Sequence, residues 1–227
     1  MSGTPAKHLE LYRLIMTEIK ERCTVLRIAA EQKLDVWPVA TFELGYLQIR
    51  LICELMGLGC LTAHGDIQAT YSKRLFQTYE PGRIFAELGK LHPNFFPRAC
   101  SSKITNIGGI TDIEVLEDNR FLSKEEIIAI HGKTGNVLHR GDLKSIGRPL
   151  HLNFQELLDW HNKIVDMLRI HLISLHDINR YVLIIMNDPH TGAVGAAEIQ
   201  ATHLSEVWRA DQVIRRTPKE RKERSRG

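Results

Sequence analysis

The chain has 227 residues, 43% of them hydrophobic and 25% charged, which is typical of a globular protein and argues against disorder along its whole length. The N-terminus has no signal-peptide pattern, and the longest apolar runs, residues 55–61 and 181–186, are far shorter than the roughly 20 residues of a membrane span. We therefore expect a cytoplasmic protein that neither enters a membrane nor is secreted. The net charge of +3 is uneven, because residues 215–227 carry seven Lys or Arg against two Glu.

The first predicted element is a long helix that begins at Thr4 and Pro5, an N-cap residue followed by proline in the first turn. Apolar side chains then recur every three or four residues and predict one buried stripe, formed by Tyr12, Ile15, Ile19, Cys23, Leu26 and Ala30. The pattern stops at Trp37, because a residue before proline avoids helical angles.

A second helix is predicted over residues 39–64, where apolar side chains occupy most faces. Such a helix belongs at the centre of a bundle, and Gly57 and Gly59 are expected to allow close packing of a neighbour. Shorter helices are predicted over residues 67–77 and 83–91. Residues 92–110, which contain several prolines and glycines, are predicted to form a loop, and residues 112–118 alternate in period two as a short strand does.

Two capping boxes predict the starts of two further helices. Ser123 is followed three residues later by Glu126, and Asn153 is followed in the same way by Glu156. The helices that they open are predicted to run to about residues 139 and 175. The apolar face of the second consists of Leu157, Trp160, Ile164, Met167, Leu168 and either His171 or Leu172.

The C-terminal part is predicted to contain an antiparallel hairpin, with strands at residues 180–186 and 193–200 around a turn at 188–192. A helix over about 205–215 precedes a basic tail that lacks apolar residues and is expected to be disordered. The predicted fold class is α+β, mainly α: a helical bundle with a small antiparallel β-hairpin or sheet. Residues 1–203 form the one predicted domain, and residues 204–227 form the short helix and tail.

A cysteine–histidine set on the second helix has two interpretations. Cys53, Cys60 and His64 lie on one helical face, and thiolates with imidazole are good zinc ligands. However, seven residues separate the two sulfurs by about 10 Å along the helix axis, more than one tetrahedral ion can bridge. We therefore predict buried, reduced cysteines, as for the remaining Cys23 and Cys100, and no metal or cofactor.

The candidate functional residues lie near the end of the helix that begins after Ser123. His139 is the candidate acid–base group, with Lys133 or Arg140 to stabilise phosphate charge, while His131 and Asn136 are candidate binding residues. The alternative interpretation is an ordinary helix C-terminus, where cations interact favourably with the helix dipole and glycine ends the helix.

The long antiparallel helices, with a polar residue five variable positions before a histidine, resemble HEPN-type domains. These are helical bundles, often dimeric, of prokaryotic toxin and defence proteins. In catalytic members an Arg, a few variable residues and a His form a composite RNase site across the dimer. Lys133 to His139 has comparable spacing, with Lys133 in place of the motif's Arg. The resemblance covers residues 4–64 and 123–175. Residues 53–66 and 91–97 also look like uncharacterised bacterial proteins, a likeness that carries no function.

Two functions follow from these observations. The first is a bacterial helical interaction or regulatory module of a defence, toxin–antitoxin or mobile-element system, with a protein partner or a second copy of the chain as ligand. The alternative is a metal-independent, HEPN-like endoribonuclease. In either case RNA is a possible partner of the basic tail, through Arg216, Arg221 and Lys222.

Overall fold

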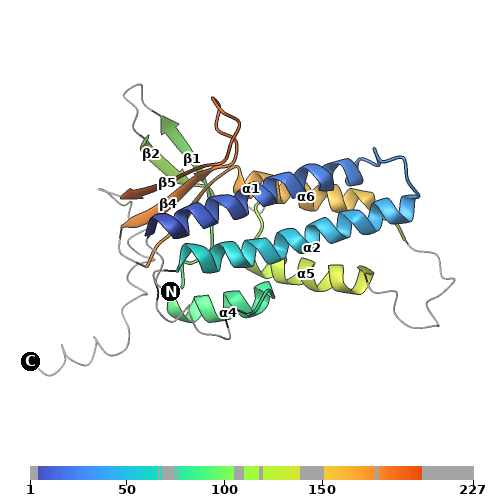
Figure 1. Cartoon of the computed structure of the whole chain (residues 1–227), viewed down its shortest axis with the longest axis horizontal. Coiled ribbons are helices and arrows are strands. Elements are labelled where there is room, and N and C mark those ends of the chain that lie inside the picture. Colours follow the sequence, from blue (N-terminus) through green and yellow to red (C-terminus); the bar gives the residue numbers. More distant parts are fainter. Residues whose placement is uncertain are drawn as a thin grey trace, which may run out of the picture.

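The structure is a computed structural model that describes residues 5–65, 67, 75, 77–104, 110–117, 120–138, 151–176 and 179–200. Its helices are α1 (Pro5–Ala30), α2 (Pro38–Ala63), α4 (Pro81–Leu91), α5 (Lys124–Leu138) and α6 (Phe154–Leu168). Its strands are β1 (Arg98–Ile104), β2 (Ile110–Val115), β3 (Ile170–Ser174), β4 (Arg180–Ile185) and β5 (Gly195–Gln200). The long helices lie side by side, and the sheet lies at one end of the bundle (Figure 1). The predicted fold class, α+β and mainly α, is confirmed.

Helix α2 is the central element of the bundle, as its apolar composition predicts. It contacts α1, α4, α5 and α6, and close approach on two sides depends on its glycines. A Cβ atom at Gly59 would lie 3.1 Å from the Tyr12 and Met16 side chains of α1, and one at Gly57 would lie 3.2 Å from α4. The stripe predicted for α1 is also confirmed, because Tyr12, Ile19 and Leu26 are among the most deeply buried side chains.

Both predicted N-caps form at helix starts, but only the first completes a reciprocal capping box. The Ser123 hydroxyl accepts a hydrogen bond from the Glu126 amide at 3.1 Å, and the Glu126 carboxylate accepts one from the Ser123 amide at 2.9 Å. The Asn153 side chain likewise accepts from the Glu156 amide at 3.2 Å. The Glu156 carboxylate does not complete a reciprocal bond, because it is engaged with side chains of α2 and α5.

The five described strands form one antiparallel sheet in the order β2-β1-β3-β4-β5. The predicted C-terminal hairpin is present as β4 and β5, with Ile184 paired to Ala196. Its turn is held by Asp188, whose carboxylate accepts hydrogen bonds from the amides of His190 and Thr191. Gly192 adopts a positive φ of 68°, which glycine tolerates without steric cost.

Most boundaries differ from the prediction by a few residues, and two strands were not predicted. The segment predicted as a loop over residues 92–110 contains β1, and the helix predicted to reach residue 175 ends at Leu168, after which β3 begins. β3 is the middle strand of the sheet, bonded to β1 on one side and β4 on the other. β4 follows β3 directly as a hairpin, whereas β1 lies about 70 residues earlier in the chain, so periodicity within residues 154–175 does not reveal the pairing with β1. Most of the helix predicted over residues 67–77, and all residues from 201 on, lie outside the described residues.

Among the described helices, α2 is the one long and apolar enough to cross a membrane, and 56% of its most apolar window is buried inside the protein. This is weak support for a membrane span, because the central helix of a bundle meets the same criterion.

Candidate functional site

The structure divides the residues predicted as one functional segment between two neighbours of α5. His131 and Lys133 are two positions apart, so they project from the helix about 200° apart. His131 contacts α2, whereas Lys133 contacts α6. Asn136 is exposed on the same helix. His139 and Arg140, and Arg216, Arg221 and Lys222 of the tail, lie outside the described residues.

Lys133 belongs to a polar cluster that joins α5, α6 and α2. Its ammonium group forms an ion pair with Glu156 and lies 5.3 Å from the centre of the Trp160 ring. The other carboxylate oxygen of Glu156 accepts a hydrogen bond of 2.7 Å from the Tyr46 hydroxyl. Burial, and then this bond, raise the pKa of Tyr46. The charge of Lys133 is thus balanced within the protein and also contacts an aromatic face.

His131 of α5 belongs to a separate cluster, which it forms with Arg50 and Glu54 of α2. Its Nε2 lies 3.2 Å from a carboxylate oxygen of Glu54, and the same oxygen forms an ion pair with Nε of Arg50 at 3.1 Å. The three side chains are between 13% and 26% exposed, so the cluster lies at the edge of the helix interface and not in an open cleft.

The cysteine–histidine set of α2 is buried. All four cysteines are free and buried, and burial raises the pKa of Cys23, Cys53 and Cys100 to about 12. The two ring nitrogens of His64 lie 2.7 Å from the Cys60 carbonyl oxygen and 3.0 Å from that of Ser174. Its ring therefore faces backbone oxygens. Within the described ranges, no three His, Cys, Asp or Glu side chains gather as metal ligands would.

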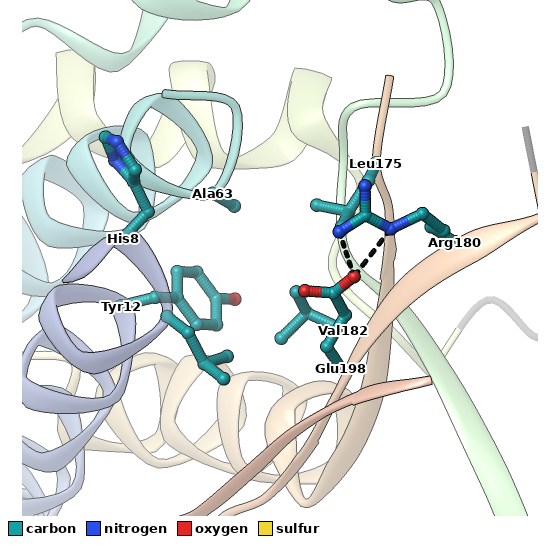
Figure 2. A pocket seen from close by; sticks show the side chains of 8 residues that line it. His8, Tyr12, Ala63, Leu175, Arg180, Val182 and Glu198 are labelled. Carbon is teal, nitrogen blue, oxygen red and sulfur yellow. Dashed lines mark hydrogen bonds and ion pairs between the residues drawn. The ribbon is translucent and has the colours of Figure 1, made fainter. Parts of the chain in front are cut away.

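A small pocket opens where α1 and the end of α2 meet the sheet (Figure 2). Its volume of about 60 Å³ is enough for about four water-sized groups. The walls are mainly apolar, and polar atoms come from both sides of the opening. The lining residues are His8, Leu9, Tyr12, Ala63, Leu175, Arg180, Val182 and Glu198. Because these residues come from five segments of the chain, no local motif identifies the pocket.

Tyr12, which lines this pocket, contacts a buried histidine. The Tyr12 hydroxyl lies 2.9 Å from Nε2 of His171, and Nδ1 of His171 lies 2.8 Å from the Leu168 carbonyl oxygen. Both rings are buried. Tyr12 was predicted as an apolar stripe residue, and His171 as a residue of a helix face. Only the packing of α1 on β3 brings the two polar atoms together.

A stripe of exposed and half-buried apolar side chains runs along the outer side of α1 and α2. On α2, five leucines recur at intervals of three or four residues and lie within about 80° of one another. On α1, two leucines and a valine lie on one face beside them, with Glu18 and Glu21 between the leucines and the valine. We call this surface the leucine face; it consists of Leu11, Leu14 and Val25 of α1 and Leu44, Leu47, Leu51, Leu55 and Leu58 of α2.

The leucine face lies on the side of the α1–α2 pair opposite to α6. Lys20, on the other flank of α1, bonds to Asn187 beside the sheet, and Gly45 of α2 packs against Leu157 of α6. Leu11, Leu14 and Leu47 are 47%, 49% and 40% exposed. No described element covers these three side chains, and α1 and α2 lie uncovered side by side in the view of Figure 1.

Comparison with known proteins gives no further guide to function. No family model matches the chain, and neither the curated proteins nor the solved structures yield a match. The resemblance to HEPN-type domains stays a prediction.

Proposed function

We propose that this chain is a helical interaction and regulatory module that acts as a homodimer, with the leucine face as its self-association surface. The observation that carries the proposal is the exposure of Leu11, Leu14 and Leu47 on two adjacent helices. Single exposed apolar residues are common on monomers, but an apolar stripe such as that of the five α2 leucines, extended by Leu11 and Leu14 of the adjacent helix, is typical of an interaction surface.

The spacing of the α2 leucines suits packing against another helix. Intervals of three and four residues place side chains where the ridges of one helix enter the grooves of a second. An antiparallel pair of α2 helices, with its two-fold axis near Leu47, would place Leu44 against Leu51 of the partner subunit. The same arrangement would be repeated on the other side of the axis, as an isologous interface requires.

Charges beside the leucines favour a second copy over an unrelated partner. Glu43 and Arg50 lie on one flank of α2, four residues before and three residues after Leu47. In the antiparallel arrangement, Glu43 would face Arg50 of the partner subunit, and two such pairs would form. Arg50 already forms an ion pair with Glu54 through Nε, and its guanidinium has further N–H groups to donate.

The size of the face is suited to a dimer. Helix α1 has 26 residues, which corresponds to a length of about 39 Å, and two adjacent helices are together about 20 Å wide. The whole outer side of the pair, of which the leucine face is the central part, therefore covers about 800 Å², close to the area that each partner contributes to a standard interface. Glu18 and Glu21 lie between Leu14 and Val25 on α1, and carboxylates in this position disfavour lipid as the occupant.

Light scattering after size-exclusion chromatography tests the proposal. The wild type is expected to have a mass of about 52 kDa, twice the 25.9 kDa of one chain. Leu47→Glu is expected to be a folded monomer, because it buries a carboxylate at the centre of the interface. The matched control is Val165→Glu, the same kind of change at a 38% exposed apolar residue of α6, and it should remain a dimer.

Three outcomes would overturn this proposal: a wild type that stays monomeric at high concentration, a Leu47→Glu variant that remains dimeric, or wild-type protein that floats with phosphatidylcholine vesicles. The first two remove the second copy as occupant, and the third replaces it by a lipid surface.

A further inference from the structure

Beyond self-association, we propose that the pocket between α1 and the sheet binds a small primary alkylammonium group. The proposal depends on two oxygen acceptors on opposite walls of the pocket, Tyr12 Oη of α1 and a carboxylate oxygen of Glu198 of β5. Figure 2 shows the Tyr12 hydroxyl and the Glu198 carboxylate directed toward one another across the opening.

Tyr12 can only accept a further hydrogen bond. The Leu168 carbonyl oxygen beside Nδ1 of His171 is an acceptor, so Nδ1 carries the ring proton and Nε2 has the lone pair. The Tyr12 hydroxyl therefore donates its one proton to Nε2, over 2.9 Å. Its oxygen retains lone pairs, and no other described residue donates to them. A ligand that meets this wall must bring an N–H or O–H group.

Glu198 offers the second acceptor. Arg180 contacts Glu198 through Nε at 2.6 Å and through a terminal nitrogen, and both nitrogens meet the same carboxylate oxygen, Oε1. Among the described residues, none donates to Oε2. A carboxylate accepts more strongly from a charged donor than from a neutral one, so an ammonium group fits the pair of oxygens better than a hydroxyl.

The rest of the pocket restricts the ligand to a short alkyl chain. Leu9, Ala63, Leu175 and Val182 provide apolar walls, and the volume of about 60 Å³ accommodates about four water-sized groups. His8 is held at the rim against Gly65, where a Cβ atom would lie 2.2 Å from the imidazole ring. The pocket thus suits an ammonium head with about three carbons, such as n-propylammonium.

Methyl NMR spectra of the full chain, titrated with n-propylammonium chloride, test this proposal. The methyl signals of Ala63, Leu175 and Val182 are expected to shift and saturate, with a dissociation constant on the order of 1 mM for so small a ligand. Propionate, of similar size and opposite charge, and sodium chloride at equal ionic strength are expected to leave these signals in place.

Two variants locate the ammonium group. Tyr12→Phe removes one acceptor while retaining the ring, and Glu198→Gln removes the charge; each is expected to weaken binding about tenfold or more. The matched control is Glu117→Gln, which removes the charge of another Arg–Glu ion pair, that of Arg98 and Glu117, outside the pocket. It should leave the affinity unchanged.

The proposal is overturned if n-propylammonium causes no saturable shift, or if propionate binds equally well. It is also overturned if Glu198→Gln weakens binding no more than Glu117→Gln does. Because the pocket lies apart from Leu47, the monomeric Leu47→Glu variant should bind with wild-type affinity, so that failure of the dimer proposal leaves this test intact.

Discussion

The Tyr12 hydroxyl donates a hydrogen bond of 2.9 Å to Nε2 of His171, joining α1 to the central strand of the sheet across 159 residues of chain. Both residues are buried, which favours a neutral imidazole, and with its proton on Nδ1 toward the Leu168 carbonyl this ring accepts at Nε2. Burial lowers the pKa of His171 to about 4, from an ordinary value of 6.5, although its bond to the Leu168 carbonyl opposes this shift.

The lowered pKa of His171 predicts a loss of stability in mild acid. Between pH 6.5 and 4 the unfolded chain binds a proton at this residue and the folded chain does not, so the free energy of unfolding falls as the pH falls. The full shift corresponds to about 3 kcal/mol. This contribution of neutral His171 to the free energy of unfolding is fully present above pH 6.5 and is lost by about pH 4.

Urea unfolding between pH 4.5 and 7.5 measures this effect. His171→Leu is the comparison, since it lacks the titrating group, and its stability should change much less over this interval. Carboxylates with lowered pKa values, such as Glu31 at about 2, lose their contribution mainly below their ordinary value of 4.5 and so fall outside the window. Equal slopes for the two proteins would contradict the prediction.

Adjacent residues of α2 should differ in their contribution to stability. Ile52 has no exposed surface and belongs to the main core, whereas Leu51 is half-buried on the leucine face. Ile52→Ala is expected to lower the free energy of unfolding by about 2–5 kcal/mol, because it removes buried methyl groups and leaves a cavity. Leu51→Ala should cost less in a monomeric background such as Leu47→Glu. Denaturant unfolding of both variants checks this order. A larger loss of unfolding free energy for Leu51→Ala would mean that α2 is rotated about its axis, with Leu51 and not Ile52 in the core.

In the cluster of Lys133, Glu156 and Tyr46, the Glu156 carboxylate should contribute most to the free energy of unfolding. Glu156→Ala removes the partner of both other groups and leaves the Tyr46 hydroxyl without its acceptor, at an expected cost of about 1–3 kcal/mol. Lys133→Ala removes a half-exposed ammonium, for which about 0–1 kcal/mol is expected. A double-mutant cycle measures the coupling of the two residues. A greater loss for Lys133→Ala would show that its contact with Trp160 dominates.

The RNase alternative makes a separate prediction about His139. As an interaction module, the purified wild type should not cleave structured or single-stranded RNA in the absence of metal. If it does cleave, His139→Ala should lower the rate by about 10²–10⁴-fold, the usual contribution of general acid–base catalysis. Wild-type cleavage that His139→Ala abolishes, with an unchanged thermal melt, would replace the proposed function by the enzymatic one.

Local signals in the sequence determined where most helices begin and what they bury. The Ser123 and Asn153 caps bond to amides three residues ahead, so the information is contained in one turn of chain. The period of the α1 stripe and the apolar composition of α2 likewise predicted a bundle with α2 at its centre. The β4–β5 hairpin was predictable because its two strands are joined by one short turn.

The strand β3 and the side-chain clusters were decided by tertiary structure alone. The segment Ile170–Ser174 continues a helical apolar pattern in sequence, yet it is a strand, because β1 and β4 supply backbone bonding partners on both sides. Lys133 and His131 lie in one candidate segment of the sequence, but helix geometry directs them to different neighbours, Glu156 and Glu54. The acceptors of Tyr12 and Glu198 meet only because α1 packs beside β5. Contacts between residues so far apart depend on the packing of whole elements, which no local pattern encodes.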